Sequence, residues 1–278
     1  MSLRYAYNTN GCANHRLDDA LQLIAGCGYA GVALTLDHHH LDPFAATWAQ
    51  DARRLAARLR ELQLGCVIET GARYLLDPRD KHEPTLVSAS AEGRRRRVDF
   101  LARAVDIAEI LEAEAVSFWA GVPKPGVGRE DALGWLLDGL QAVCSYAQLR
   151  GVTPAFEPEP GMLVETAAEW AALGVPGLSL ALDTGHCLVT QDIDPAGAVR
   201  MYADRLGTVA VEDMRRGVHE HLPFGQGEMD LPSILSALQE IGFRRLVCVE
   251  LSRESPRAHL AIPESIAWLK AHEPAARG

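Results

Sequence analysis

Short runs of β-branched and apolar residues alternate with longer stretches of helical periodicity along the whole sequence. A strictly alternating strand and helix order favours parallel strands, because each helix returns the chain to the start of the next strand. The expected strands are residues 3–8, 31–36, 65–69, 115–119, 152–156, 178–182, 207–211 and 246–250. The expected helices are residues 17–26, 45–63, 95–112, 130–149, 166–173, 195–204, 231–240 and 260–271.

Eight such units within 278 residues predict an α/β protein that forms a single (β/α)8 TIM barrel, one domain over residues 1–278. An open doubly wound sheet fits less well, since it usually has fewer strands and no glycine-rich phosphate fingerprint follows the first strand. Asp194 and Asp230 each stand where a helix N-cap is expected, with a proline in the following turn.

The charge balance restricts the partners of the chain. Lys and Arg number 27 against 37 Asp and Glu, and the net charge of -10 argues against a nucleic-acid partner. The one basic run, Arg94 to Arg97, opens an expected helix and is interpreted as a solvated face without function.

The remaining composition is typical of a cytoplasmic protein. No apolar run approaches the roughly 20 residues that span a bilayer, and the first residues lack the apolar stretch of a signal peptide. The six cysteines show no CxxC spacing and are expected to be reduced thiols. We therefore expect no membrane partner.

Four acidic residues stand at the ends of expected strands: Glu69, Glu157, Asp183 and Glu250. The carboxyl ends of barrel strands form one face, where barrel enzymes place their active sites. Carboxylates gathered there repel one another unless they share a proton or a cation. A divalent metal ion is the leading interpretation.

Histidines could add nitrogen ligands. His186 follows Asp183 by three residues, and His219 and His221 flank Glu220, so an extended segment turns both imidazoles to one side. Taken alone, such a histidine pair is more typical of a polar loop. Three consecutive histidines, residues 38–40, cannot all face one site.

Several loop and strand-end residues could bind a substrate beside Glu69: Trp119, Lys81, Arg215 and Arg253, with Tyr74 and His82 nearby. Each signal is weak by itself. A loop lysine or arginine is usually solvated, and a tryptophan at a strand end is also typical of a barrel plug.

Together these motifs resemble the xylose isomerase-like TIM barrel superfamily, which includes sugar phosphate isomerases and epimerases and AP endonuclease family 2. The resemblance rests on Glu157, on Asp183 and His186 in LDTGH, on the loop HEHLPFGQGEMD, and on Glu250 in VCVELSRES. It implies that Glu157, Asp183 and Glu250 bind metal, and that His186 contacts substrate or a further metal ion. It also implies that Glu157 and Glu250 are the catalytic acid and base, and it is compatible with a homo-oligomer.

One position departs from the family pattern. Members usually carry a metal-binding histidine on the seventh strand, three residues before an aspartate; here Ala210 precedes Asp213. Either the metal site is weakened, or His219, His221 or Glu212 substitutes. The endonuclease branch binds metal through a DxH pair in the matching loop. However, the third and fourth strands here end in VIETG and SFWAG, without that branch's histidines.

The function implied by the resemblance is a metal-dependent isomerase or epimerase of a sugar or sugar-like polyol, acting by proton transfer next to a carbonyl. The expected cofactor is Mn, Zn, Co or Mg, and the expected partner is a sugar or sugar phosphate. An endonuclease IV-like phosphoesterase and a non-catalytic barrel in a biosynthetic pathway are the alternatives.

Overall fold

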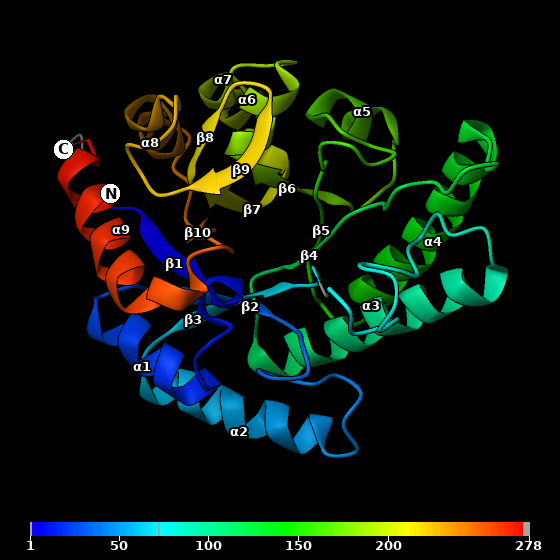
Figure 1. Cartoon of the computed structure of the whole chain (residues 1–278), viewed down its shortest axis with the longest axis horizontal. Helices are drawn as coiled ribbons and strands as arrows, with labels where there is room; N and C mark the ends of the chain where they lie inside the picture. Colours follow the sequence, from blue (N-terminus) through cyan, green and yellow to red (C-terminus); the bar gives the residue numbers. More distant parts are fainter. Residues whose placement is uncertain (1, 72, 275–278) are drawn as a thin grey trace.

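Eight parallel strands close into a barrel in the computed structural model, which describes residues 2–71 and 73–274 (Figure 1). The strands are β1 Arg4–Asn8, β2 Gly31–Thr35, β3 Gly65–Glu69, β4 Val116–Phe118, β5 Pro154–Phe156, β6 Ser179–Asp183, β7 Leu206–Val211 and β10 Leu246–Val249. They follow one another around the barrel in chain order, and β10 closes it by pairing with β1, Tyr5 opposite Val247. The predicted (β/α)8 barrel is confirmed. The extent of the single domain, residues 1–278, stays a prediction.

Helices surround the strands (Figure 1). They are α1 Leu17–Gly26, α2 Trp48–Glu61, α3 Ala91–Leu111, α4 Arg129–Leu149, α5 Ala167–Ala172, α6 Thr184–Thr190, α7 Pro195–Met201, α8 Leu231–Glu240 and α9 Ala258–His272. Short 3-10 turns cover Thr9–Cys12, Ala203–Arg205 and Ser255–Arg257. Helix α3 begins earlier than expected, because the Ser90 hydroxyl caps it by accepting the backbone N–H of Gly93. Asp194 and Asp230 cap α7 and α8 as predicted.

Two elements after β6 and β7 were not expected. Helix α6 begins directly after Asp183, and an antiparallel hairpin, β8 Asp213–Arg215 and β9 Val218–Leu222, stands apart from the barrel strands (Figure 1). Both lie at the carboxyl ends of their strands, and both carry histidines.

Mostly small side chains fill the interior of the barrel. Ala6, Ala33, Val67, Ala115, Ala155, Ala181 and Cys248 form one buried cluster with Leu246. Successive side chains of a strand point to opposite faces, so residues two positions on share the interior direction. Glu69, Glu157, Asp183 and Glu250 each follow such an interior residue by two positions. Strand periodicity therefore aims all four carboxylates into the mouth of the barrel.

Arg97 corrects one interpretation of the sequence. Arg95 and Arg96 are exposed as expected of a solvated face, but Arg97 is 0% exposed. Its guanidinium lies 4.3 Å from the centre of the Trp119 ring, and one of its N–H groups donates to the carbonyl of Thr70 at 3.4 Å. The run therefore includes a buried cation that packs against a strand-end aromatic side chain.

Among the described helices, none is both long enough and apolar enough to cross a membrane. The six cysteines are free thiols, as the absence of paired spacing predicted.

Candidate metal and substrate site

A cavity of about 550 Å³ opens at the carboxyl ends of the barrel strands. Its walls combine strand-end carboxylates, the histidines of α6 and β9, and cationic and aromatic residues of the segments that follow β3, β4 and β10. Predominantly polar walls suit a hydroxyl-rich ligand better than an apolar one.

Three carboxylates converge in this cavity. Glu157, Asp183 and Glu250 offer oxygen atoms that all lie within 4.8 Å of one another. Neighbouring side chains orient the two glutamates: the Asn10 amide donates to Glu250 Oε1 at 2.9 Å, and the Ser117 hydroxyl donates to Glu157 Oε2 at 3.4 Å. This spacing suits a shared cation.

Asp183 has two different oxygens. Its Oδ1 caps α6 by accepting the backbone N–H groups of Gly185 at 2.8 Å and His186 at 3.1 Å. Its Oδ2 is buried and has no hydrogen-bond partner among the described residues. A buried carboxylate oxygen without a partner is costly. A metal ion at this point would satisfy that oxygen, so the residues present fit a divalent cation.

The pKa values reflect the crowding of acids. Burial raises the pKa of Glu157 well above its ordinary range, and Glu159, Glu69 and Glu250 raise it further. Burial and the charge of Glu250 likewise raise the pKa of Glu69. Burial also acts to raise the pKa of Asp183, but His186 and His221 outweigh it and lower that pKa. Without a cation, several of these acids hold protons.

The β8–β9 hairpin owes its shape to Asp213. Its carboxylate accepts the backbone N–H groups of Met214 at 3.0 Å, Gly225 at 2.9 Å and Met229 at 3.0 Å. Gly227 lies so close to Asp213 that a Cβ atom would collide with the carboxylate. The aspartate of the family motif is therefore structural here, and it holds the segment that carries His219 and His221.

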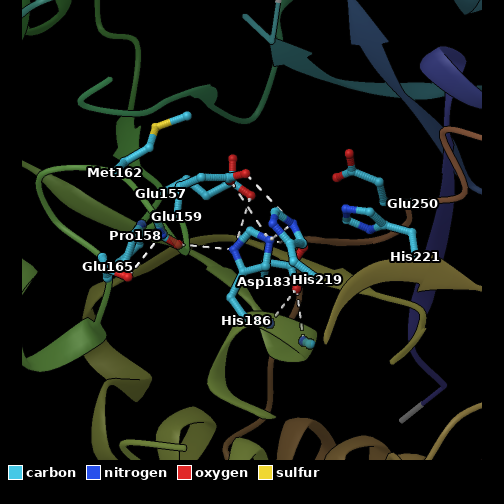
Figure 2. A network of polar contacts seen from close by, with 12 residues as sticks. Glu157, Pro158, Glu159, Met162, Glu165, Asp183, His186, His219, His221 and Glu250 are labelled. Atoms are coloured by element: carbon cyan, nitrogen blue, oxygen red, sulfur yellow. Dashed lines mark hydrogen bonds and ion pairs between the residues drawn. The ribbon is translucent and has the colours of Figure 1, made fainter. Parts of the chain in front are cut away.

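Three histidines meet beside the acids, as Figure 2 shows. The Nδ1–H of His186 donates to the carbonyl of Pro158 at 3.0 Å, since a carbonyl can only accept. The Nε2 of His186 then lies 3.1 Å from the Nε2 of His219. Burial and the neighbouring His186 lower the pKa of His219 to about 4, so that ring is neutral at neutral pH. Neutral imidazoles are the form that binds metal ions.

His221 reaches the region left open by Ala210. In the barrel register Ala210 lies beside Asp183, and its methyl group offers no ligand atom. Asp183, Glu212 and His221 present ligand atoms within 4.8 Å of one another. Burial acts to lower the pKa of His221, but Glu212, Glu250 and Asp183 outweigh it and raise that pKa to about 10. His221 is therefore protonated at neutral pH without a metal ion and would have to release that proton to bind one.

Glu212 is 0% exposed, and neither of its carboxylate oxygens has a hydrogen-bond partner among the described residues. Its Oε2 lies 3.8 Å from the Nδ1 of His221. Position 185 requires glycine, because a Cβ atom there would collide with the Glu212 carboxylate.

The predicted substrate contacts divide in two. Glu69, Trp119, Lys81 and Arg253 line the cavity together with His186. Arg215 does not line it: one guanidinium N–H donates to the carbonyl of Gln226 at 3.3 Å, and Nη1 lies 3.7 Å from Glu220 Oε2. Tyr74 is exposed and does not line the cavity either.

Some cavity residues were missed or misplaced from sequence. Glu159 was not among the predicted site residues, yet it lines the cavity, 3.8 Å from His186 Nε2 and 3.7 Å from His219 Nε2. Asn10 and Arg73 also line the cavity and were not among the predicted site residues. For Glu159 a signal existed, since residues two apart in an extended segment share a side.

Comparison with known proteins agrees with this architecture. A family model described as xylose isomerase-like TIM barrel matches residues 21–272. A search of curated proteins found no match. The structure resembles D-allulose 3-epimerase from Methylomonas sp. in complex with D-allulose, with a TM-score of 0.74, 18% identity and coverage of 97% of each chain.

Two further solved structures share the fold. An L-ribulose 3-epimerase has a TM-score of 0.77 at 20% identity, covering 98% of this chain and 94% of that one. An AP endonuclease, family 2, from Brucella melitensis has a TM-score of 0.73 at 18% identity, covering 98% and 100%. Because the family match extends over most of the sequence and agrees with the barrel and its order of motifs, the chain belongs to the xylose isomerase-like TIM barrel family.

Proposed function

We propose that the protein is a divalent-metal-dependent isomerase or epimerase of a sugar or sugar-like polyol. The observation that carries the proposal is the convergence of Glu157, Asp183 and Glu250 on one point, where the buried Asp183 Oδ2 has no hydrogen-bond partner among the described residues. His186 Nε2 lies near that oxygen, at 3.4 Å. Structures of epimerases acting on allulose and ribulose share the fold and support the substrate class.

Glu157, Asp183 and Glu250 would hold the metal ion, with His221 as the fourth ligand in place of a seventh-strand histidine. A divalent ion there would polarise the carbonyl and hydroxyl oxygens of the substrate and so lower the barrier to loss of the adjacent proton. His221 reaches the site from the hairpin rather than from the barrel, so its position depends on Asp213.

Glu157 and Glu250 are the candidates for proton transfer. They extend from separate strands, β5 and β10, which are not neighbours in the barrel. One carboxylate would take the proton from the carbon next to the carbonyl, and the other would return a proton to the opposite face. One proton leaves and one returns, so the number of protons on the substrate is unchanged and the configuration at the carbon next to the carbonyl is inverted. Asn10 and Ser117 would hold the two glutamates in place.

The test combines metal analysis with proton exchange. Protein purified without a tag is expected to contain about one equivalent of manganese, zinc or cobalt, and to exchange deuterium from D2O into ketoses. Glu157→Gln and Glu250→Gln are expected to lose at least about 1000-fold in kcat with an unchanged circular dichroism spectrum. Glu130→Gln, an exposed glutamate at the start of α4, is the control. Retained exchange in both cavity variants would reject their catalytic roles.

The histidine cluster favours a second candidate, metal-dependent phosphoester hydrolysis. His186, His219 and His221 could hold a further ion beside the carboxylates. About three equivalents of metal, with cleavage of abasic-site DNA, would favour this function over isomerisation. Protein that binds no metal and catalyses neither reaction would instead be a non-catalytic barrel.

A further inference from the structure

Two cations of the segment between β3 and α3 face the cavity without a counter-charge. Arg73 and Lys81 both line the cavity, and neither side chain has a hydrogen bond or ion pair with any described residue. The backbone N–H of His82 donates to the carbonyl of Arg73 at 2.6 Å. This bond brings the backbone at Arg73 next to the backbone at His82, which directly follows Lys81. The two cations therefore line the same part of the cavity.

Two acids of the same segment, Asp80 and Glu83, pair with Lys124, and a third, Asp77, accepts the backbone N–H of Arg79. Lys124 lies 2.8 Å from Asp80 Oδ2 and 3.5 Å from Glu83 Oε1. Arg73 is half-buried and Lys81 is exposed, and because both line the cavity, the partners open to them are water and a bound ligand. Arg73 and Lys81 therefore remain available to a ligand.

The barrel order places the strand before these cations opposite the strand before the histidine hairpin. Around the closed barrel, β3 lies four strands from β7 in either direction, and the hairpin with His219 and His221 follows β7. The hairpin histidines thus lie across the barrel mouth from β3, the strand that leads into the segment with Arg73 and Lys81. Trp119 and His82 both line this cavity. Their rings are nearly perpendicular, and the ring centroids lie 5.2 Å apart.

We propose that the substrate carries an anionic group, a carboxylate or a phosphate, at the end of its carbon chain remote from the reacting carbonyl, and that Arg73 and Lys81 bind this group. This inference rests on the proposed function and specifies its substrate class. An arginine fork and a lysine ammonium both match carboxylate and phosphate oxygens. A cavity of about 550 Å³ has the size of small-molecule sites in general.

The first experiment compares matched substrates. A neutral ketose, the same ketose with a terminal phosphate and the same ketose with a terminal carboxylate are assayed by proton exchange. At least one anionic member is expected to exceed the neutral one about tenfold or more in kcat/KM, and the better of the two identifies the source of the charge. Neutral sugars turned over as well as both anionic partners would overturn the inference.

The second experiment removes the charges. Arg73→Gln and Lys81→Gln are each expected to lower the ratio of kcat/KM for the anionic substrate to kcat/KM for the neutral ketose about 10- to 100-fold. Arg79→Gln is the matched control, since Arg79 belongs to the same segment, is exposed and does not line the cavity. Equal losses on neutral and anionic substrates would contradict anion recognition.

A binding measurement separates this inference from the proposed function. Chelator-treated protein is titrated with inorganic phosphate by calorimetry, and binding is expected for the wild type and for Arg79→Gln but not for the Arg73→Gln, Lys81→Gln double variant. If no sugar exchanges protons but phosphate binds in this pattern, the proposed function fails and the anion site stands. If sugars exchange protons but phosphate binding is absent or unchanged by the double variant, and the terminal carboxylate gives no gain in kcat/KM, the anion site alone fails.

Discussion

The two sides of the cavity are built differently. Glu157, Asp183 and Glu250 stand at the ends of strands β5, β6 and β10, whose register fixes their direction. Arg73 and Lys81 belong to the long segment after β3, whose described residues form no helix or strand. Rigid strand ends suit chemistry, which depends on sub-ångström placement, whereas loops can change between relatives without disturbing the barrel. The comparison suggests that the reaction type resides in the strands and substrate choice in the loops.

The most severe test of the strand side is Asp183→Asn. Asparagine keeps an acceptor for the N-cap of α6 but removes the negative charge at Oδ2. Loss of a residue that merely orients a metal ligand costs about 10- to 100-fold in affinity, so loss of a direct ligand should cost at least about 100-fold. Titration of the chelated protein with Mn or Zn measures this.

Asp194→Asn is the matched control, because Asp194 is also an N-cap, at the start of α7, but lies outside the large cavity. Equal metal affinity in Asp183→Asn and the wild type would show that Asp183 is only a cap.

His221→Ala tests the part of the metal site that depends on a loop. If the hairpin histidine substitutes for the missing strand residue, its loss should weaken metal binding about 10- to 100-fold. Ala210→His in the same background should restore part of that affinity, since position 210 lies beside Asp183 in the barrel. His259→Ala, on the exposed face of α9, is the control. Unaltered metal binding in His221→Ala would remove the hairpin from the site.

The difference between strands and loops also explains what the sequence could predict. Strand periodicity and the period of two sufficed to place Glu157, Asp183 and Glu250 at one mouth, because local pattern determines register and direction in a parallel barrel. The N-cap aspartates 194 and 230 were equally predictable, since capping is a local interaction.

The missed features depend on long-range contacts. Arg97 was interpreted as solvated because helical position alone does not show that Trp119 covers it. Arg215 and Lys81 looked alike as loop cations, and only the folded path of each loop separates them. For Glu159, the spacing of two from Glu157 was a local signal, but its contacts with His186 and His219 depend on how α6 and β9 fold onto the cavity.

The pH dependence of the metal-free protein distinguishes the acid side from ordinary surface acids. The raised pKa of Glu157 means that the folded state holds its proton more tightly than the unfolded state. Stability from this group is present at low pH and is lost as the pH rises above its ordinary value of 4.5. His221 acts in the same direction: its contribution is full below 6.5 and is lost as the pH rises through about 10.

The Tm of chelated protein is therefore expected to fall with rising pH over this range, and divalent metal should reduce or reverse the fall because it binds the deprotonated ligands. Asp183, with its lowered pKa, contributes stability that is already complete above 3.8 and does not oppose the trend. In chelated Glu157→Gln protein, Tm is expected to fall less steeply with rising pH than in the wild type, because one of the buried acids has been removed. A metal-free Tm that rises with pH would contradict the crowding of acids.

The smallest expected effect is that of Arg215→Gln, and it tests whether the loop side is selective. Arg215 was predicted from sequence to contact substrate, but its guanidinium faces Gln226 and Glu220 outside the cavity. Its replacement should change kcat/KM by about twofold or less, the size expected for an exposed ion pair. Arg253→Gln is the comparison, since Arg253 pairs with the same Glu220 yet lines the cavity. A larger loss in Arg215→Gln than in Arg253→Gln would mean that the hairpin closes over the ligand, and loop residues would then share in the chemistry that the strand ends are proposed to perform.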